Sequence, residues 1–206
     1  MRTRAQLSKG DREIRMWLTI VAIGLVILVI LMWYVKAYMK LEKEERRVNS
    51  QWGVVKTTYV TRIGFFLDIA YISRGYYAQE KEAFEKVYTT RSKTFDVDID
   101  PMRLSDSIFA VYDAAQAEFA NSLSDLLIVL EKYPELKENK TYNQRLYALK
   151  IIDGKIAYER RNFNEAALKF NTNLHTFPKN IAASIRGIKE RPYLVLYDEP
   201  KVAPTN

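Results

Sequence analysis

The chain has 206 residues, 48% of them hydrophobic, with no cysteine, seven glycines and six prolines. The lack of cysteine excludes disulfides, thiol chemistry and sulfur-based metal sites, and the small number of glycines and prolines favours long helices over a turn-rich sheet. The formal net charge is +7, but a basic segment (137–191) follows an acidic one (80–136) and is expected to pair with it, so the charge does not indicate a nucleic-acid partner.

An uncharged apolar run of twenty residues (16–35) follows a short basic tail (1–15). A helix with a rise of ~1.5 Å per residue would span ~30 Å over this run, the thickness of a bilayer's hydrocarbon core. Trp17, Trp33 and Tyr34 lie near its two ends, where aromatic rings prefer the headgroup layer. The bulky residues at its end argue against a signal-peptide cleavage site. We predict a single-pass transmembrane helix with the lipid bilayer as its partner, in preference to a buried core helix.

The orientation of this helix is weakly specified. Residues 1–15 carry five Lys/Arg, and residues 36–55 also carry five. The positive-inside rule therefore discriminates little, but a short and strongly basic tail resists translocation. We expect the tail inside, and the domain that follows in an extracytoplasmic or lumenal compartment.

The segment 36–190 is predicted to form a helical bundle. Its first helix is expected to run from the membrane anchor to about Thr94, because one row of residues repeats at steps of four and three. The row consists of Val48, Trp52, Val55, Tyr59, Arg62, Phe66 and Ile69. A turn at 95–101 interrupts the pattern, and we expect Asp100 to cap the next helix and Pro101 to begin it.

The second helix is predicted over about 102–132. It ends at Tyr133 and Pro134, because the residue before a proline avoids the helical region. Its expected apolar stripe consists of Leu104, Ile108, Val111, Ala115, Phe119, Leu123, Leu126 and Leu130.

The third helix is predicted over about 139–176, where Phe177 and Pro178 stop it. Its seam has the 3.5-residue spacing of a coiled coil. The seam consists of Tyr142, Leu146, Leu149, Asp153, Ile156, Arg160, Phe163, Ala167, Phe170, Leu174 and Phe177. A short helix at 181–189 and a loose tail at 191–206 are expected to follow.

Together these elements predict an all-α fold, in which an N-terminal transmembrane helix precedes a long up-down-up antiparallel three-helix bundle. The short connections make neighbouring helices antiparallel, so the first and third helices are expected to be parallel. The bundle would stand as a rod on its anchor, stabilised by burial of the three apolar stripes.

Three charged residues interrupt the apolar rows of the bundle: Arg62, Asp153 and Arg160. Arg62 and Asp153 lie at equivalent distances along the first and third helices. We hypothesise a buried ion pair between them that fixes helix register, because such pairs specify more than they stabilise. The alternative is that both side chains reach solvent at the edge of the seam.

Residue patterns for catalysis or metal binding are weak. His175 is the single histidine, and a lone histidine near a helix end is more often a capping or surface residue than a base or a ligand. Asp96, Asp98 and Asp100 resemble the start of a calcium-binding loop, but its glycine and its later glutamate are missing. Glycine-rich phosphate loops and paired-histidine motifs are absent from the sequence. We expect no catalytic residues, no cofactor and no metal site.

Several segments resemble the LemA family. The likeness is strongest at 130–137 (LEKYPELK), which resembles the family's tyrosine-proline-glutamate-leucine turn, and at 156–166 (IAYERRNFNEA), which resembles its arginine-arginine-x-aromatic-asparagine segment. Residues 170–173 and 177–180 continue the likeness in register, within a resemblance that extends over about 40–195. It implies an N-terminal anchor, a long antiparallel helical bundle and no established enzymatic activity.

The first long helix departs from the family pattern. The family usually has two arginines and then an aspartate-leucine-isoleucine-proline-asparagine stretch, whereas residues 61–68 read TRIGFFLD and retain only Arg62 and the apolar character. The chain is therefore identified as a divergent member. One divergent branch, the MamQ proteins, belongs to magnetosome membranes and is implicated in forming them, and the residues leave open whether this chain belongs to that branch.

From these features we expect a non-enzymatic, membrane-anchored helical scaffold that binds protein partners or further copies of itself. A magnetosome-membrane protein of the MamQ type is the first alternative. A bundle that handles a small ligand or a metal is the second, and it would require a polar pocket between the helices.

Overall fold

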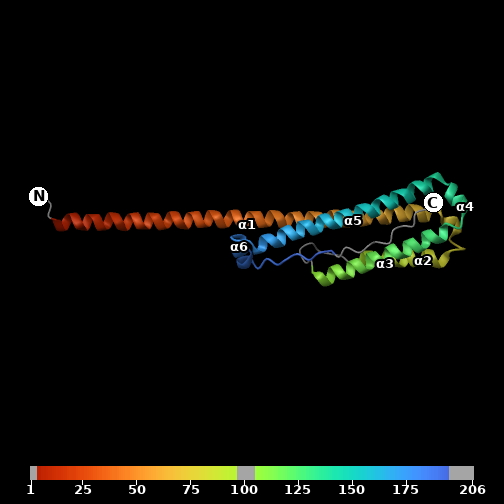
Figure 1. Ribbon diagram of the computed structural model, residues 1–206. Coiled ribbons are helices and arrows are strands. Elements are labelled where there is room, and N and C mark those ends of the chain that lie inside the picture. The colour runs from red at the N-terminus through yellow and green to blue at the C-terminus, as the bar shows by residue number, and fades with distance from the viewer. Residues whose placement is uncertain (1–3, 97–104, 195–206) are drawn as a thin grey trace. The chain divides into compact units, whose positions relative to one another are not determined.

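The computed structural model describes residues 4–96 and 105–194. Within these ranges every regular element is a helix, which confirms the all-α class (Figure 1). The elements are α1 (Arg4–Ile72), the 3-10 turn η1 (Arg74–Tyr76), α2 (Lys81–Asp96), α3 (Asp106–Leu130), α4 (Pro134–Glu138), α5 (Lys140–His175) and α6 (Lys179–Arg186).

The chain divides into two compact units, each of which combines segments from both ends of the sequence. The anchor unit comprises Met1–Lys43 and Thr172–Lys189, and the bundle unit comprises Glu44–Asn171 and Glu190–Asn206. Helices α1 and α5 contribute residues to both units.

The first helix of the bundle is shorter than the sequence predicts. It ends at Ile72, and the expected continuous helix to about Thr94 is wrong. Ser73 is buried and its hydroxyl donates a hydrogen bond of 2.7 Å to the carbonyl of Ile69, and Gly75 follows in the turn, so the local sequence disfavours a continuous helix. The chain then reverses, and Phe84 and Val87 of α2 become buried in the bundle core.

This reversal changes the topology of the bundle. Residues later in α1 pair with residues earlier in α5. These two helices are therefore antiparallel, rather than parallel as expected (Figure 1). The pairs are Glu44 with Lys169, Arg62 with Asp153, and Asp68 with Arg145. In the described part of the bundle unit, α1, α2, α3 and α5 therefore alternate in direction, in place of an up-down-up arrangement of three helices.

The predicted apolar row of α1 forms one wall of the core. All seven of its residues from Val48 to Ile69 are buried. Trp52 lies among the rings of Phe109, Tyr112 and Phe163, with ring centroids 5.0, 5.2 and 5.9 Å away. The contacts with Tyr112 and Phe163 are edge-to-face, and such contacts add ~0.5–1.5 kcal/mol per pair to the effect of burial alone.

The stripe predicted for α3 is correct only in its C-terminal half. Phe119, Leu123, Leu126 and Leu130 are buried, but Val111 is exposed, and Phe109 and Tyr112 are buried beside it instead. A stripe traced through apolar residues alone lies one position away from the true stripe, because the true stripe passes through polar residues. The helix begins at Asp106 rather than near Met102, with the Ser105 hydroxyl accepting a 3.4 Å hydrogen bond from the amide of Ile108. The expected roles of Asp98, Asp100 and Pro101 lie outside the described residues.

The third predicted helix corresponds closely to α5. Its expected range of 139–176 compares with Lys140–His175, and its seam is buried except at Asp153 and Leu146, which are half-buried, and at Phe177, which is exposed. The Asn139 side chain caps the helix by accepting hydrogen bonds of 3.0 and 3.1 Å from the amides of Thr141 and Tyr142.

The start of the expected loose tail is wrong for residues 191–194. This segment lies against α5, and Arg191, Pro192 and Leu194 are buried. Asn171 donates to the carbonyl of Arg191 and accepts from its amide, each at 2.8 Å. Asn164 makes the same pair of 2.8 Å bonds with Leu194. Two asparagine side chains thus replace the backbone partners that an extended segment needs.

Candidate functional site

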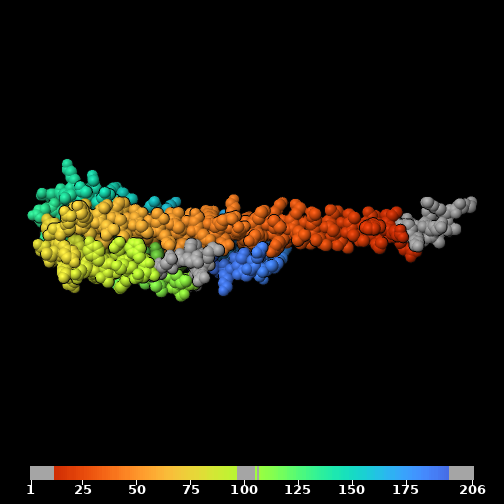
Figure 2. Space-filling model, turned by 180° about the vertical axis from the view of Figure 1, so that it is seen from behind, coloured from red at the N-terminus to blue at the C-terminus, as the bar shows by residue number. Residues whose placement is uncertain are grey.

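The apolar run of α1 carries the clearest functional signature of the anchor unit. None of its side chains from Met16 to Met32 is buried, although nearly all of them are large and hydrophobic. Figure 2 shows this stretch uncovered, with α6 lying against α1 at its end. It is the one stretch within the described residues that is long and apolar enough to cross a membrane. An uncovered apolar helix of this length is stable in lipid rather than in water.

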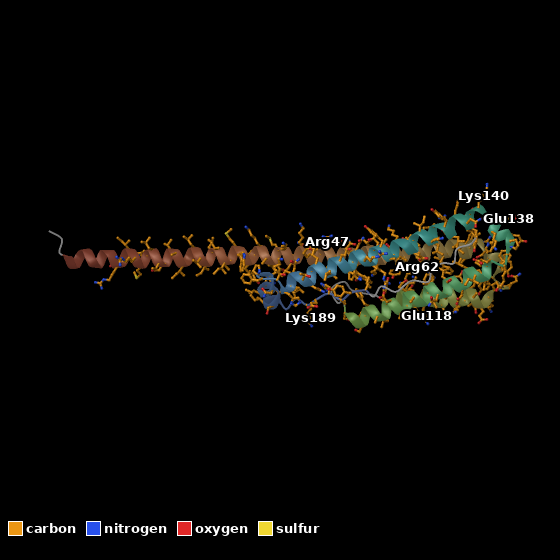
Figure 3. All side chains as sticks on the ribbon, in the orientation of Figure 1. Arg47, Arg62, Glu118, Glu138, Lys140 and Lys189 are labelled. Carbon is orange, nitrogen blue, oxygen red and sulfur yellow. The ribbon has the colours of Figure 1, made fainter. Side chains whose placement is uncertain are left out.

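The interior of the bundle unit contains a cluster of charged and polar side chains from three helices. We call it the buried charge cluster, and its members are Tyr59 and Arg62 of α1, Asp113 and Gln116 of α3, and Asp153 and Arg160 of α5. Figure 3 marks Arg62 among these helices. Its two arginines and two aspartates balance in formal charge.

The most buried ion pair in this cluster joins Arg160 to Asp113. Arg160 Nη2 lies 3.1 Å from Asp113 Oδ2, and the two side chains are 5% and 2% exposed. The other terminal nitrogen of Arg160 donates to the Tyr59 hydroxyl. Each terminal nitrogen of the Arg160 guanidinium therefore has a hydrogen-bond partner, as a desolvated guanidinium requires.

Arg62 occupies the second half of the cluster. Its Nη2 donates to Gln116 Oε1 at 3.0 Å and to the Gln116 carbonyl at 3.2 Å, and its Nη1 lies 3.7 Å from Asp153 Oδ1. The guanidinium also lies over the rings of Tyr59 and Phe119, 5.1 and 5.4 Å from their centroids. The structure therefore brings Arg62 and Asp153 together, although the helices that carry them are antiparallel. Asp153 is 24% exposed, so it lies at the edge of the core.

Asp113 and Gln116 are the cluster members that the sequence did not reveal. Both lie on the buried face of α3, between Phe109 and Phe119. The signal that could have found them is the spacing of these aromatic residues, which with Tyr112 define a stripe that passes through both polar positions. Burial, followed by proximity to Tyr59, raises the pKa of Tyr112, so this phenol stays neutral.

The predicted Tyr133-Pro134 turn joins two parts of the bundle unit. Pro134 begins α4, and the Tyr133 hydroxyl donates to Glu80 Oε1 at 2.8 Å. In a matching contact the Tyr76 hydroxyl donates to Glu135, and the rings of Tyr76 and Tyr133 pack against each other at a tilt of 39°, with centroids 4.2 Å apart. These hydrogen bonds raise the pKa of both phenols, because a phenolate could not donate to a carboxylate. The turn thus holds the α1–α2 reversal through side chains.

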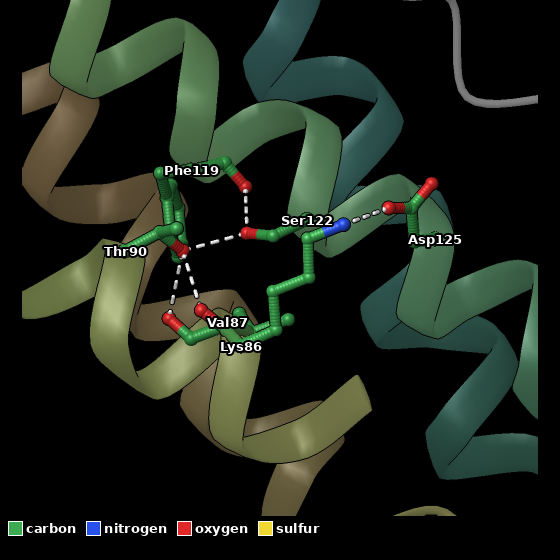
Figure 4. Close-up of polar contacts among 6 residues, drawn as sticks. All are labelled: Lys86, Val87, Thr90, Phe119, Ser122 and Asp125. Carbon is green, nitrogen blue, oxygen red and sulfur yellow. Dashed lines mark hydrogen bonds and ion pairs between the residues drawn. The ribbon is translucent and has the colours of Figure 1, made fainter. Parts of the chain in front are cut away.

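Helices α2 and α3 are joined by short polar contacts (Figure 4). The hydroxyls of Thr90 and Ser122 lie 2.6 Å apart and are buried. Lys86 Nζ donates to Asp125 Oδ2 at 2.7 Å on the exposed side. Each hydroxyl also lies within hydrogen-bond distance of a carbonyl in its own helix. These side chains therefore serve helix packing rather than chemistry.

The remaining predicted residues, Phe177 and Pro178, lie in the anchor unit. They follow α5, the bond between them is cis, and the exposed Phe177 ring packs edge-on against Trp33 with centroids 5.0 Å apart. The described residues contain no group of three or more acidic or histidine side chains placed to hold a metal ion, and Asp98 and Asp100 lie outside them.

The chain is similar in sequence to known proteins over most of its length. A model of the LemA family matches residues 51–205. The chain belongs to the LemA family. The matched residues include the last part of α1, all of α2 to α5 with the Tyr133-Pro134 turn, and the segment held by Asn164 and Asn171.

The LemA relatives include magnetosome proteins. The chain is 33% identical over 79 residues to magnetosome proteins MamQ 1 and MamQ 2 of Paramagnetospirillum magneticum, covering 38% of this chain and 29% of theirs. It is 25% identical over 153 residues to protein LemA of Metamycoplasma hominis, covering 73% of this chain and 65% of that one. The chain thus spans under a third of the length of the magnetosome relatives it matches. No solved structure matches it.

Proposed function

We propose that this LemA-family protein is a single-pass, membrane-anchored helical scaffold without catalytic activity of its own, which presents its bundle to protein partners or to further copies of itself. The observation that carries the proposal is the contrast between an uncovered apolar helix and an interior whose charges bind one another. Arg160 forms a buried ion pair with Asp113 and also donates to the Tyr59 hydroxyl, so these side chains bind one another in the interior of the bundle.

Exposed apolar side chains of the bundle support a binding role for its surface. The side chains of Tyr147, Ile151 and Tyr158 on α5 and of Ile128 on α3 are large, apolar and exposed. Exposed aromatic and aliphatic residues are the usual anchors of protein interfaces.

We place the bundle in an extracytoplasmic or lumenal compartment, because the basic N-terminal tail resists translocation.

Cross-linking in intact membranes tests the scaffold role. We expect the full-length protein to be captured in defined complexes, with the complexes reduced in a Tyr147→Ser/Tyr158→Ser variant that keeps its helicity. The matched control is Lys150→Ser, an exposed residue of the same helix outside the row of Tyr147, Ile151 and Tyr158, which should leave the complexes unchanged. If both variants cross-link like the wild type, this face of α5 does not bind partners.

Protease treatment of intact cells tests the orientation. A C-terminal epitope tag is expected to be lost when protease is added outside, while an N-terminal tag stays protected. Loss of the N-terminal tag alone would reverse the proposed topology.

The magnetosome relatives favour a second candidate, a magnetosome-membrane protein of the MamQ type. The supporting observation is the 33% identity to MamQ 1 and MamQ 2. A tagged full-length protein expressed in a magnetosome-forming bacterium would then co-purify with isolated magnetosomes. An unrelated single-pass protein of similar size is the control, and equal recovery of both in the general membrane fraction would contradict this candidate.

A further inference from the structure

Helix α6 buries its two alanines and exposes its two isoleucines. Ala182 and Ala183 are buried, whereas Ile181 is 45% exposed and Ile185 is 66% exposed. Ile181 and Ile185 are four residues apart, so they lie on one face of the helix. In water the opposite orientation would be favoured, because burying isoleucine removes far more apolar surface than burying alanine. The exposed face of α6 therefore requires an apolar environment.

The same face continues toward the membrane span. Phe177 precedes α6, is as exposed as Ile185, and packs against Trp33 with ring centroids 5.0 Å apart. Trp33 lies near the end of the apolar run of α1, where tryptophan prefers the boundary between acyl chains and headgroups. At the other end of α6, the Arg186 guanidinium lies 4.7 Å from the centroid of the Tyr38 ring. These contacts place α6 beside the part of α1 that leaves the apolar run.

The charges near α6 are almost all positive. The parts of the anchor unit that flank it, 36–43 and 172–189, contain six Lys/Arg and one acidic residue, Glu42. Lys189, marked in Figure 3, follows the helix, and Lys36 and Lys40 are exposed on α1. Basic residues around an exposed apolar helix face are typical of helices that lie in a membrane surface and attract anionic headgroups.

We propose that α6 is an interfacial helix that lies in the membrane surface, with Phe177, Ile181 and Ile185 inserted at the boundary of the acyl chains and the surrounding Lys/Arg bound to anionic headgroups. The proposal rests on the proposed membrane anchor. It gives the protein a second membrane contact beside its span, which would fix the tilt and rotation of the anchor unit relative to the bilayer. A second copy of the chain covering the same face is the competing occupant.

Site-specific fluorescence in vesicles tests the proposal on the full-length chain. The sequence contains no cysteine, so a single introduced cysteine carries the only label. An environment-sensitive dye is attached to Ile185→Cys, to Leu25→Cys within the span, and to Val111→Cys as the matched control. Val111 is also an exposed β-branched apolar residue, 58% exposed, but it lies on α3 in the bundle unit. All three sites are exposed, and circular dichroism verifies that each labelled protein keeps its helicity.

We expect the dye at residue 185 to shift to the blue in anionic vesicles and to be quenched strongly by lipids that carry a spin label near the headgroup. The dye at residue 25 should be quenched by lipids labelled deep in the acyl chain, and the dye at residue 111 by neither type of labelled lipid. Quenching at 25 without quenching at 185 would overturn the proposal for α6 and leave the anchor intact.

Two other outcomes also contradict the proposal. Absence of quenching at 25 would refute the membrane anchor and with it the interfacial helix. A blue shift at 185 that is insensitive to spin-labelled lipid and disappears when the protein is diluted in excess lipid would show that a second copy covers this face.

Discussion

At the scale of single residues, Asp113 supplies the buried negative charge that pairs with a buried arginine in the bundle core. Arg160 is the partner of Asp113 in the structure, and Asp153, seven residues before Arg160 on the same helix, pairs with Arg62 instead. The two pairs differ in burial, since Asp113 is 2% exposed and Asp153 is 24% exposed. Removing the more buried partner should therefore have the larger effect.

Replacement of Asp113 with alanine is expected to lower the free energy of unfolding by ~3–5 kcal/mol, because it leaves Arg160 buried without a compensating charge. A double variant, Asp113→Leu with Arg160→Met, should recover much of this loss. Denaturant unfolding in detergent micelles, followed by circular dichroism, measures both. The control is Asp153→Ala, for which we expect a smaller loss, and equal losses in the two single variants would show that burial does not set the effect.

Tyr142 links stability to alkaline pH. Burial is the main cause that raises its pKa to about 12, from 10.0. The folded protein thus binds this proton more tightly than the unfolded chain does, so the stabilisation is complete below pH ~10 and decreases as the pH rises from there through about 12. Tyr142→Phe should remove this part of the pH dependence. Thermal unfolding of both proteins over this range measures it, and parallel curves would contradict the assignment.

At the scale of elements, the sequence predicted α5 well and the end of α1 poorly. The seam of α5 repeats without interruption and ends at a proline, so local pattern and tertiary packing agree. The break after Ile72 has no proline, and the chain reverses there because Phe84 and Val87 gain a core to pack against. That gain depends on contacts distant in sequence, which periodicity cannot detect. The missed reversal also explains why Arg62 and Asp153 meet on antiparallel helices.

The spacing of the two asparagines on α5 matches the segment they hold. Seven residues of helix from Asn164 to Asn171 rise ~10.5 Å, and three residues of extended chain containing a proline rise ~9.3 Å. The amides and carbonyls of Arg191 and Leu194 therefore come into reach of successive asparagine side chains. This register was not visible in the sequence, because a lone asparagine on a helix has many other uses.

Replacement of Asn171 with alanine is expected to destabilise the bundle by ~1–3 kcal/mol, because it leaves the buried backbone groups of Arg191 without partners. Hydrogen exchange should show faster exchange of the Arg191 amide while the Leu194 amide stays protected by Asn164. Asn162→Ala, two residues before Asn164 and bonded only to Glu159 in the described contacts, is the control. Unchanged exchange at Arg191 would show that this asparagine does not hold the segment.

At the scale of the whole molecule, an apolar helix that is exposed from Met16 to Met32 precedes a bundle whose interior contains paired charges. The LemA match covers most of the bundle, whereas the predicted transmembrane residues 16–35 lie outside the matched residues. We therefore predict that these residues anchor the protein in a bilayer.

Alkaline carbonate extraction of membranes from cells that express the full-length protein tests this claim most directly. Integral proteins remain in the membrane pellet under these conditions, and peripheral proteins are released. We expect the wild-type protein to stay in the pellet, and a variant with Leu25, Val26 and Leu28 replaced by lysine to move to the supernatant, because each central charge strongly opposes insertion. Recovery of the wild-type protein in the supernatant would show that residues 16–35 do not span a bilayer.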